Sequence, residues 1–179
     1  MPMMTGGRFM AETLHGYGVT HVFFVPVIIQ RAMLEMEKLG IKRILTHGEK
    51  AAAYMADGYA RASHKVGVCA AQNVGAANLA AGLQDPFLGG SSVLALTGRK
   101  ARMSQHRNSY QEVDHLRPFS AVTKYSVPVD SVEQLPFLLR QALREATSGA
   151  PGPVHLDLEG TSGNVVMEGE ADLEVIIEE

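Results

Sequence analysis

Short apolar runs alternate with amphipathic or small-residue segments along most of the chain. The apolar runs predict strands over residues 21–25, 42–46, 66–71, 92–97, 121–127 and 153–158. The segments between them predict helices over residues 5–17, 29–39, 48–62, 76–88 and 132–147. Strands that are apolar on both faces and alternate with helices indicate a parallel sheet covered on both sides. The expected fold class is α/β: a three-layer α/β/α sandwich with a six-stranded, mainly parallel sheet of Rossmann-like build.

The predicted elements fill residues 1–158, which we expect to form one domain. Residues 98–118 are polar and irregular, with one short helical turn expected near their end. Residues 159–179 differ from the rest, because they are acidic and carry only scattered valine and isoleucine. We expect this segment to be an acidic tail or the start of an interdomain linker.

Composition and charge narrow the class of protein. The chain has 179 residues, 46% of them hydrophobic and 20% charged, which suits a globular domain with a proper core. Its net charge of -3, without a block of like charge, argues against a nucleic-acid surface. No run of 18 apolar residues predicts a membrane span, and the N-terminus lacks the apolar core of a signal peptide. The lone Cys69 lies in an apolar run and is expected to be a buried, inert thiol in a cytoplasmic protein.

Common catalytic signatures are absent from the sequence. The sequence contains neither of the glycine-rich nucleotide-binding motifs, G-x-G-x-x-G after a strand and G-x-x-x-x-G-K-[ST]. It also contains no G-x-S-x-G nucleophile elbow. The seven histidines show no metal-ligand spacing, so no metal site is expected in this chain. His155 is expected to be an ordinary strand residue.

Four segments follow predicted strands and should meet at one edge of the sheet, where ligands of such folds collect. They are residues 26–28, 47–49, 72–75 and 98–100. Glu49 begins an alanine-rich helix, and its simplest interpretation is a carboxylate stabilised by the helix dipole. The small residues that follow would let other backbone or a flat ligand approach closely.

Seven short motifs stand in a characteristic order along the chain. They are residues 18–23 with Val25-Pro26, Glu49 eight positions before the run 57–61, residues 75–79 with Gly82-Leu83, residues 94–98, residues 110–114, Thr123-Lys124 and residues 149–154. Together they resemble the N-terminal, pyrimidine-binding domain of thiamine diphosphate-dependent enzymes of the acetolactate synthase, benzoylformate decarboxylase and pyruvate oxidase type. The resemblance runs from about Gly7 to Asp157.

The resemblance implies roles for particular residues. Glu49 matches the family's catalytic glutamate, which hydrogen-bonds N1′ of the cofactor's aminopyrimidine. Four further residues would bind the cofactor: Pro26, Asn73, Gly75 and Asn78. Gln111 matches a glutamine that reaches the substrate side of the active site. Two alternatives stay open, because Asn78 could instead cap a helix and Gln111 could be a solvated loop amide.

The sequence departs from the family pattern in three segments. The turn after the first strand is usually rich in glycine but here contains Val27 and Ile28. Gly48 stands where many members have histidine, and Val74 interrupts a common Gly-Pro-Gly. These changes leave Glu49 in place, but they leave open the choice of substrate and the possibility of a non-catalytic copy.

The family's diphosphate-binding and metal-binding motif has no counterpart in this chain. The resemblance therefore implies one part of an acetolactate synthase-like 2-oxo acid decarboxylase or carboligase, inactive when isolated. The resemblance implies that magnesium is bound by a diphosphate-binding domain missing here, which another subunit of a homo-oligomer would supply. It also implies that the complete enzyme could hold FAD. The alternatives are a non-catalytic binding or regulatory copy, and the small subunit of a split 2-oxo acid decarboxylase.

Overall fold

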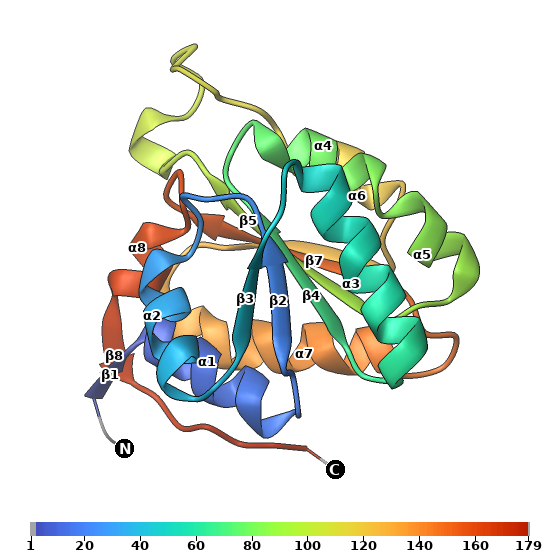
Figure 1. Cartoon of the computed structure of the whole chain (residues 1–179). Helices are drawn as coiled ribbons and strands as arrows, with labels where there is room; N and C mark the ends of the chain where they lie inside the picture. The colour runs from blue at the N-terminus through green and yellow to red at the C-terminus, as the bar shows by residue number, and fades with distance from the viewer. Residues whose placement is uncertain (1–2, 179) are drawn as a thin grey trace.

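The computed structural model describes residues 3–178 and contains a central sheet of six parallel strands (Figure 1). The strands are β2 (His21–Phe24), β3 (Lys42–Leu45), β4 (Gly67–Ala71), β5 (Val93–Arg99), β6 (Tyr125–Val129) and β7 (Val154–Glu159). Their order across the sheet is β3-β2-β4-β5-β7-β6, and every neighbouring pair is parallel. The predicted fold class is thereby confirmed.

Helices cover both faces of the sheet (Figure 1). One layer contains α1 (Gly6–Gly16), α2 (Gln30–Lys38), α7 (Leu135–Thr147) and α8 (Asn164–Glu168). The opposite layer contains α3 (Glu49–Ser63), α4 (Gly75–Ala81), α5 (Gln84–Gly89) and α6 (Leu116–Ser120). Short 3-10 turns, η1 (Arg102–Ser104) and η2 (Val132–Gln134), follow β5 and precede α7.

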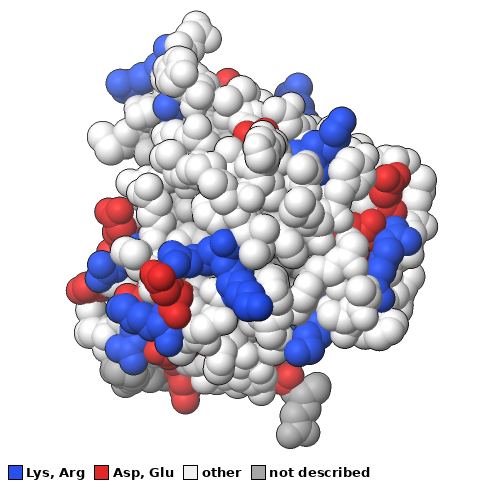
Figure 2. Space-filling model, viewed as in Figure 1, with Lys and Arg blue, Asp and Glu red and all other residues white. Residues whose placement is uncertain are grey.

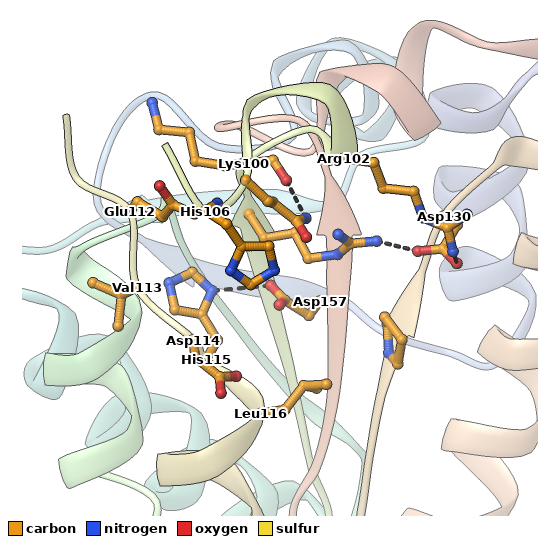
Figure 3. Close-up of a pocket in the computed structure, with 13 residues that line it drawn as sticks. Lys100, Arg102, His106, Glu112, Val113, Asp114, His115, Leu116, Asp130 and Asp157 are labelled. Atoms are coloured by element: carbon orange, nitrogen blue, oxygen red, sulfur yellow. Dashed lines mark hydrogen bonds and ion pairs between the residues drawn. The ribbon is translucent and has the colours of Figure 1, made fainter. Parts of the chain in front are cut away.

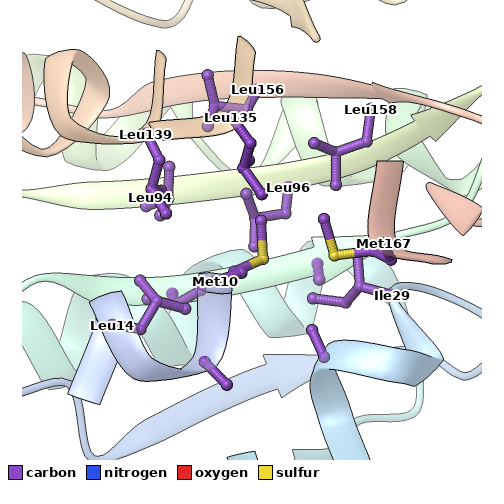
Figure 4. Close-up of a cluster of buried hydrophobic side chains, with 14 of the residues drawn as sticks. Met10, Leu14, Ile29, Leu94, Leu96, Leu135, Leu139, Leu156, Leu158 and Met167 are labelled. Carbon is purple, nitrogen blue, oxygen red and sulfur yellow. The ribbon is translucent and has the colours of Figure 1, made fainter. Parts of the chain in front are cut away.

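Successive strand residues enter two different hydrophobic cores. On β4, Val68 and Ala70 join the core beneath α1, α2, α7 and α8, whereas Cys69 and Ala71 join the core beneath α3 and α4. Figure 4 shows the first of these cores, in which side chains of α1, α7 and α8 meet the leucines of β5 and β7. Because both faces of the inner strand β4 are buried, it is apolar throughout, whereas the edge strand β3 has no buried residue and begins with Lys42 and Arg43. Burial raises the pKa of the Cys69 thiol, which agrees with an inert cysteine.

The alanine-rich face of α3 packs against the protein's own backbone. Ala53 is fully buried, and a Cβ atom at Gly82, in the turn after α4, would lie only 2.7 Å from the Cβ of Ala53. A Cβ at Gly67 would likewise meet the carbonyl group of Ala56. The small residues therefore allow α3, α4 and β4 to approach closely, and the buried part of this face is not open to a ligand.

Two predicted elements require correction. The helix expected over 76–88 is two helices, because α4 ends before Gly82 and α5 begins at Gln84, with Pro86 in its first turn, where a missing N–H is tolerated. The strand expected over 121–127 begins later, at Tyr125. The residues before it complete a turn in which Thr123 donates a hydrogen bond to the Phe119 carbonyl.

The segment predicted as a tail or linker is largely folded. It contains α8 and a short strand β8 (Glu170–Asp172), which pairs antiparallel with β1 (Met3–Thr5) at the other end of the sequence. Val166 and Met167 of α8 are fully buried, and their apolar side chains explain why this acidic segment packs against the domain. The first part of the expected tail is therefore an integral piece of the fold.

None of the helices within residues 3–178 is long and apolar enough to cross a bilayer. On the face shown in Figure 2, Lys and Arg are interspersed with Asp and Glu and do not form one continuous basic stripe.

Candidate cofactor site

Glu49 lies in the first turn of α3, at the carboxyl edge of the sheet, as predicted. Its position is fixed by Thr46, whose hydroxyl oxygen lies 3.2 Å from the Phe24 carbonyl at the end of β2 and 3.0 Å from the Gly48 carbonyl before α3. The helix N-terminus carries partial positive charge, which stabilises a carboxylate there. Glu49 is half-buried, so its carboxylate is both held by the fold and reachable from the rim.

Asn78 and Gly75 form the surroundings of that carboxylate. The Asn78 side-chain amide donates a hydrogen bond to Glu49 Oε2 at 3.2 Å. A Cβ atom at Gly75 would lie 2.5 Å from Glu49 Oε1, so only glycine leaves this oxygen in place. The helix-cap interpretation of Asn78 is wrong, because α4 begins at Gly75 and its N-cap residue is Val74.

Asn73 follows β4 at the same edge. Its side chain is fully buried, and neither Oδ1 nor Nδ2 has a hydrogen-bond partner among the described residues. A buried amide without partners is costly, since its lost hydration is not replaced. Asn73 therefore offers one acceptor and two donors beside the cluster of Glu49, Gly75 and Asn78.

The turn after β2 brings Pro26 to the rim in an exposed position. Two β-branched residues of this turn adopt left-handed backbone conformations, with φ of 69° at Val27 and 41° at Ile29. Such angles suit glycine and strain a β-branched residue. The departure from a glycine-rich turn therefore leaves the backbone in a conformation that glycine would adopt freely.

Gln111 is the residue predicted on the substrate side of the active site. It lies in the long loop after β5, where its amide donates to the Tyr110 hydroxyl at 3.3 Å. Within residues 3–178 no hydrogen bond joins Gln111 to Glu49, Asn73 or Asn78.

A second polar cluster lies at the carboxyl ends of β5, β6 and β7 and was not predicted. It lines a cavity of about 510 Å³ that does not include Glu49 (Figure 3). His115 and Asp157, which are buried, form its inner wall and are joined by a contact of 3.0 Å between Nδ1 and Oδ1. The two residues stand 42 positions apart, so no local motif could have revealed the pair. No group of His, Cys, Asp and Glu among the described residues is arranged to hold a metal ion.

Comparison with known proteins gives the chain its family. Residues 4–117 match the family model of the thiamine pyrophosphate enzyme, N-terminal TPP binding domain. The chain is 36% identical, over 96% of its length, to a probable acetolactate synthase large subunit of Methanocaldococcus jannaschii, of which it covers 29%. It is 38% identical, over 87% of its length, to the acetolactate synthase isozyme 2 large subunit of Escherichia coli, again covering 29% of the relative. A chloroplastic acetolactate synthase of Arabidopsis thaliana is 34% identical over 86% of the chain, which covers 23% of that relative.

The family match covers strands β2 to β5 and helices α1 to α5, and it includes the motifs noted in the sequence up to residue 114. The chain spans less than a third of the length of these relatives. It belongs to the family of N-terminal TPP-binding domains of thiamine pyrophosphate enzymes.

Proposed function

We propose that this chain is the pyrimidine-binding domain of a thiamine diphosphate-dependent 2-oxo acid decarboxylase or carboligase of the acetolactate synthase type. The observation that carries the proposal is the arrangement around Glu49. One of its carboxylate oxygens is anchored by Asn78, and the other lies over Gly75, where no side chain intervenes. A carboxylate fixed in this way can hold a proton shared with a ring nitrogen in a defined direction.

The residues present suit a pyrimidine ring. When bound, thiamine diphosphate supplies the electron sink for loss of carbon dioxide from a 2-oxo acid. Glu49 would hydrogen-bond the ring nitrogen, and Asn78 would keep the carboxylate in position. The unpartnered amide of Asn73 would contribute the donors and acceptor that the domain itself leaves unused. Pro26 would border the ring from the turn after β2.

The site needs a second domain. We assign the binding of magnesium and of the diphosphate to that domain, since this chain lacks the motif for them. The family resemblance implies that the second domain belongs to a partner subunit. Apolar residues are exposed on α3 and around the rim, and their burial by a partner would be favourable. They are Val27, Leu45, Tyr54, Met55 and Val74. FAD binding by the complete enzyme is proposed from the family resemblance alone, because no residue of this chain is assigned to FAD.

A non-catalytic copy of the domain is the second candidate function. The observation that favours it is the strained turn at Val27 and Ile29, where the family pattern has glycine. The loss of the usual glycines from this turn is compatible with a domain that no longer has to bind the cofactor for catalysis.

An assay of the complete protein separates the two functions. The full-length protein is incubated with a panel of 2-oxo acids, with and without thiamine diphosphate and Mg²⁺, and carbon dioxide and organic products are measured. A catalytic enzyme gives cofactor-dependent release of carbon dioxide, and the products distinguish carboligation from simple decarboxylation. Absence of turnover across the panel, with the cofactor demonstrably bound, would favour the non-catalytic copy.

A further inference from the structure

The cavity beneath the loop after β5 is separate from the site around Glu49. Glu49 follows β3 at one edge of the sheet, whereas the cavity is built on β5, β7 and β6 towards the other edge. Asn73, Gly75 and Asn78 follow β4, the neighbour of β5, and they do not line the cavity either. The lining of the cavity therefore shares no residue with the cluster around Glu49.

An ordered chain of hydrogen bonds leads to Asp157 from behind the lining of the cavity. The Thr97 hydroxyl donates to Asp157 Oδ1 at 2.7 Å, so its single proton is used there. His155 must then donate from Nε2 to the Thr97 oxygen at 2.6 Å, and its Nδ1 accepts from the Ser126 hydroxyl at 2.8 Å. Every bond in this chain points towards Asp157, as an ionised carboxylate requires.

The charge of Asp157 fixes the orientation of His115. Burial alone would raise the pKa of Asp157, but the hydrogen bond from His115, the neighbouring histidines and Thr97 together hold it below its ordinary range. His115 therefore presents Nδ1–H to Asp157 at 3.0 Å. Its other ring nitrogen, Nε2, is buried without a partner among the described residues, although His115 lines the cavity. Figure 3 shows the His115 ring facing Asp157 within this lining.

The acidic groups at the cavity are already engaged. Asp130 is paired with Arg99 and Arg102. Asp114 is paired with Arg117, and Glu112 accepts hydrogen bonds from Ser109 and from the His106 backbone.

Two of the unsatisfied groups are nitrogen donors, whereas His115 Nε2 is a donor only when the ring is protonated on both nitrogens. Arg99 Nε is buried without a partner, and no bond within the described chain engages the half-buried ammonium group of Lys100. The cavity thus lacks one component, an acceptor that carries negative charge.

We propose that this cavity binds a small oxyanion, the carboxylate or phosphate group of a metabolite, between Lys100, Arg99 and His115. The anion accepts from the Arg99 Nε–H group and the Lys100 ammonium group, whose bonds to a charged acceptor are among the stronger kinds. It also accepts from His115 Nε2–H, because its charge favours the form of the ring that is protonated on both nitrogens. Asp157 on β7 and the anion then bracket the imidazolium from opposite sides.

The titration of His115 provides a direct test. The ¹⁵N-labelled chain is titrated with inorganic phosphate at constant ionic strength, and the histidine ring resonances are followed by NMR. The expected result is a saturable shift of the His115 ring nitrogens, with half-saturation at about millimolar phosphate. The other ionisable side chains that line the cavity are Asp157, Arg99, Arg102, Lys100, His106, Glu112, Asp114 and Asp130. His155 on β7 also interacts electrostatically with His115. A parallel titration with acetate shows whether a carboxylate alone suffices.

Two variants and two matched controls complete the test. Lys100→Ala removes a partly exposed side chain without partners and should weaken phosphate binding about tenfold, as loss of one charge-assisted hydrogen bond predicts. His115→Gln should weaken it at least as much. Lys42→Ala and His15→Gln remove the same residue types elsewhere on the domain and should leave the affinity unchanged. The proposal is overturned if neither phosphate nor acetate gives a saturable shift, or if Lys42→Ala weakens binding as much as Lys100→Ala.

Discussion

The side-chain amide of Asn78 donates a hydrogen bond of 3.2 Å to Glu49 Oε2, across 29 positions of sequence and between two helices. In the proposed function Asn78 is a positioning residue. Asn78→Ala in the complete enzyme is therefore expected to lower kcat about tenfold, through loss of one hydrogen bond to a charged group. The side chain is exposed, so the free energy of unfolding should change by no more than about 0.5 kcal/mol. Steady-state kinetics and urea unfolding measure the two effects.

The matched control for Asn78 is Gln84→Ala, which removes another exposed amide from a neighbouring helix. It should leave kcat unchanged. Asn78→Asp should be more harmful than Asn78→Ala, because it places a second carboxylate beside Glu49. Equal activity of Asn78→Ala and the unmodified enzyme would remove Asn78 from the mechanism.

Gly75 is expected to tolerate no side chain. Its Cβ atom would lie 2.5 Å from Glu49 Oε1, so Gly75→Ala must displace the carboxylate. We expect weaker binding of thiamine diphosphate to the complete enzyme, measured by the cofactor concentration needed for half-maximal activity and by direct titration. Gly48→Ala is the control, since a Cβ there meets nothing within 4 Å and the backbone is extended. Similar losses in both variants would show that the rim is merely sensitive to added bulk.

Substitution by glycine should have opposite effects on the stability of the domain at Val27 and at Ile29, the two strained positions of the turn after β2. Val27 is 50% exposed and has little packing to lose, so Val27→Gly should stabilise the domain by about 1 kcal/mol through relief of backbone strain. Ile29 is fully buried, so Ile29→Gly should destabilise it, because lost burial of about 2–3 kcal/mol exceeds the strain relieved. Midpoints of urea unfolding measure both changes. A lower midpoint for Val27→Gly would contradict the strain argument.

His155 should make the domain sensitive to acid. Burial lowers its pKa to about 3, whereas an unfolded histidine titrates near 6.5. The unfolded chain therefore binds the proton first, and stability is full above about pH 6.5 and falls as the pH drops towards 3, by up to about 1.4 kcal/mol per unit. Asp157, whose pKa is also held low, adds a loss of the same sign at lower pH.

The measurement for His155 is the pH dependence of the free energy of unfolding between pH 7.5 and 4. The unmodified chain should lose stability across this range, and the exposed control His15→Gln should show the same slope. His155→Gln removes the titrating group and should flatten the upper part of the curve, whatever its stability at neutral pH. A flat curve for the unmodified chain would contradict neutral burial of His155.

Much of the fold could be predicted because it follows from local patterns. Six apolar runs became the six strands, and Glu49 lies where the run before it ends. The pairing of Met4 with Ala171 could not be predicted, because it joins the two ends of the chain and involves strands of only three residues. The buried Val166 and Met167 were hidden within an acidic segment, where composition suggested a tail.

The candidate site was predicted in part. The edge of the sheet gathers Glu49, Asn73 and Gly75 because parallel strands end together. The hydrogen bond from Asn78 to Glu49 depends on where α4 begins. If the helix began one residue earlier or later, the Asn78 side chain would point in a different direction, and sequence patterns do not fix helix boundaries that closely. Gln111 lies on a long irregular loop whose path no periodicity determines, and its side-chain amide donates a hydrogen bond to Tyr110.

The most direct test of the central claim is turnover of the complete enzyme carrying Glu49→Gln. This change keeps the shape of the side chain and its contact with Asn78 but removes the negative charge. Folding and the oligomeric state should be unaffected, and the control Glu12→Gln, on the remote helix α1, should be fully active. We predict that turnover of the 2-oxo acid falls about 10²- to 10⁴-fold, the usual contribution of a positioned proton-transfer group. Turnover equal to that of the unmodified enzyme, with thiamine diphosphate bound, would contradict the role assigned to Glu49.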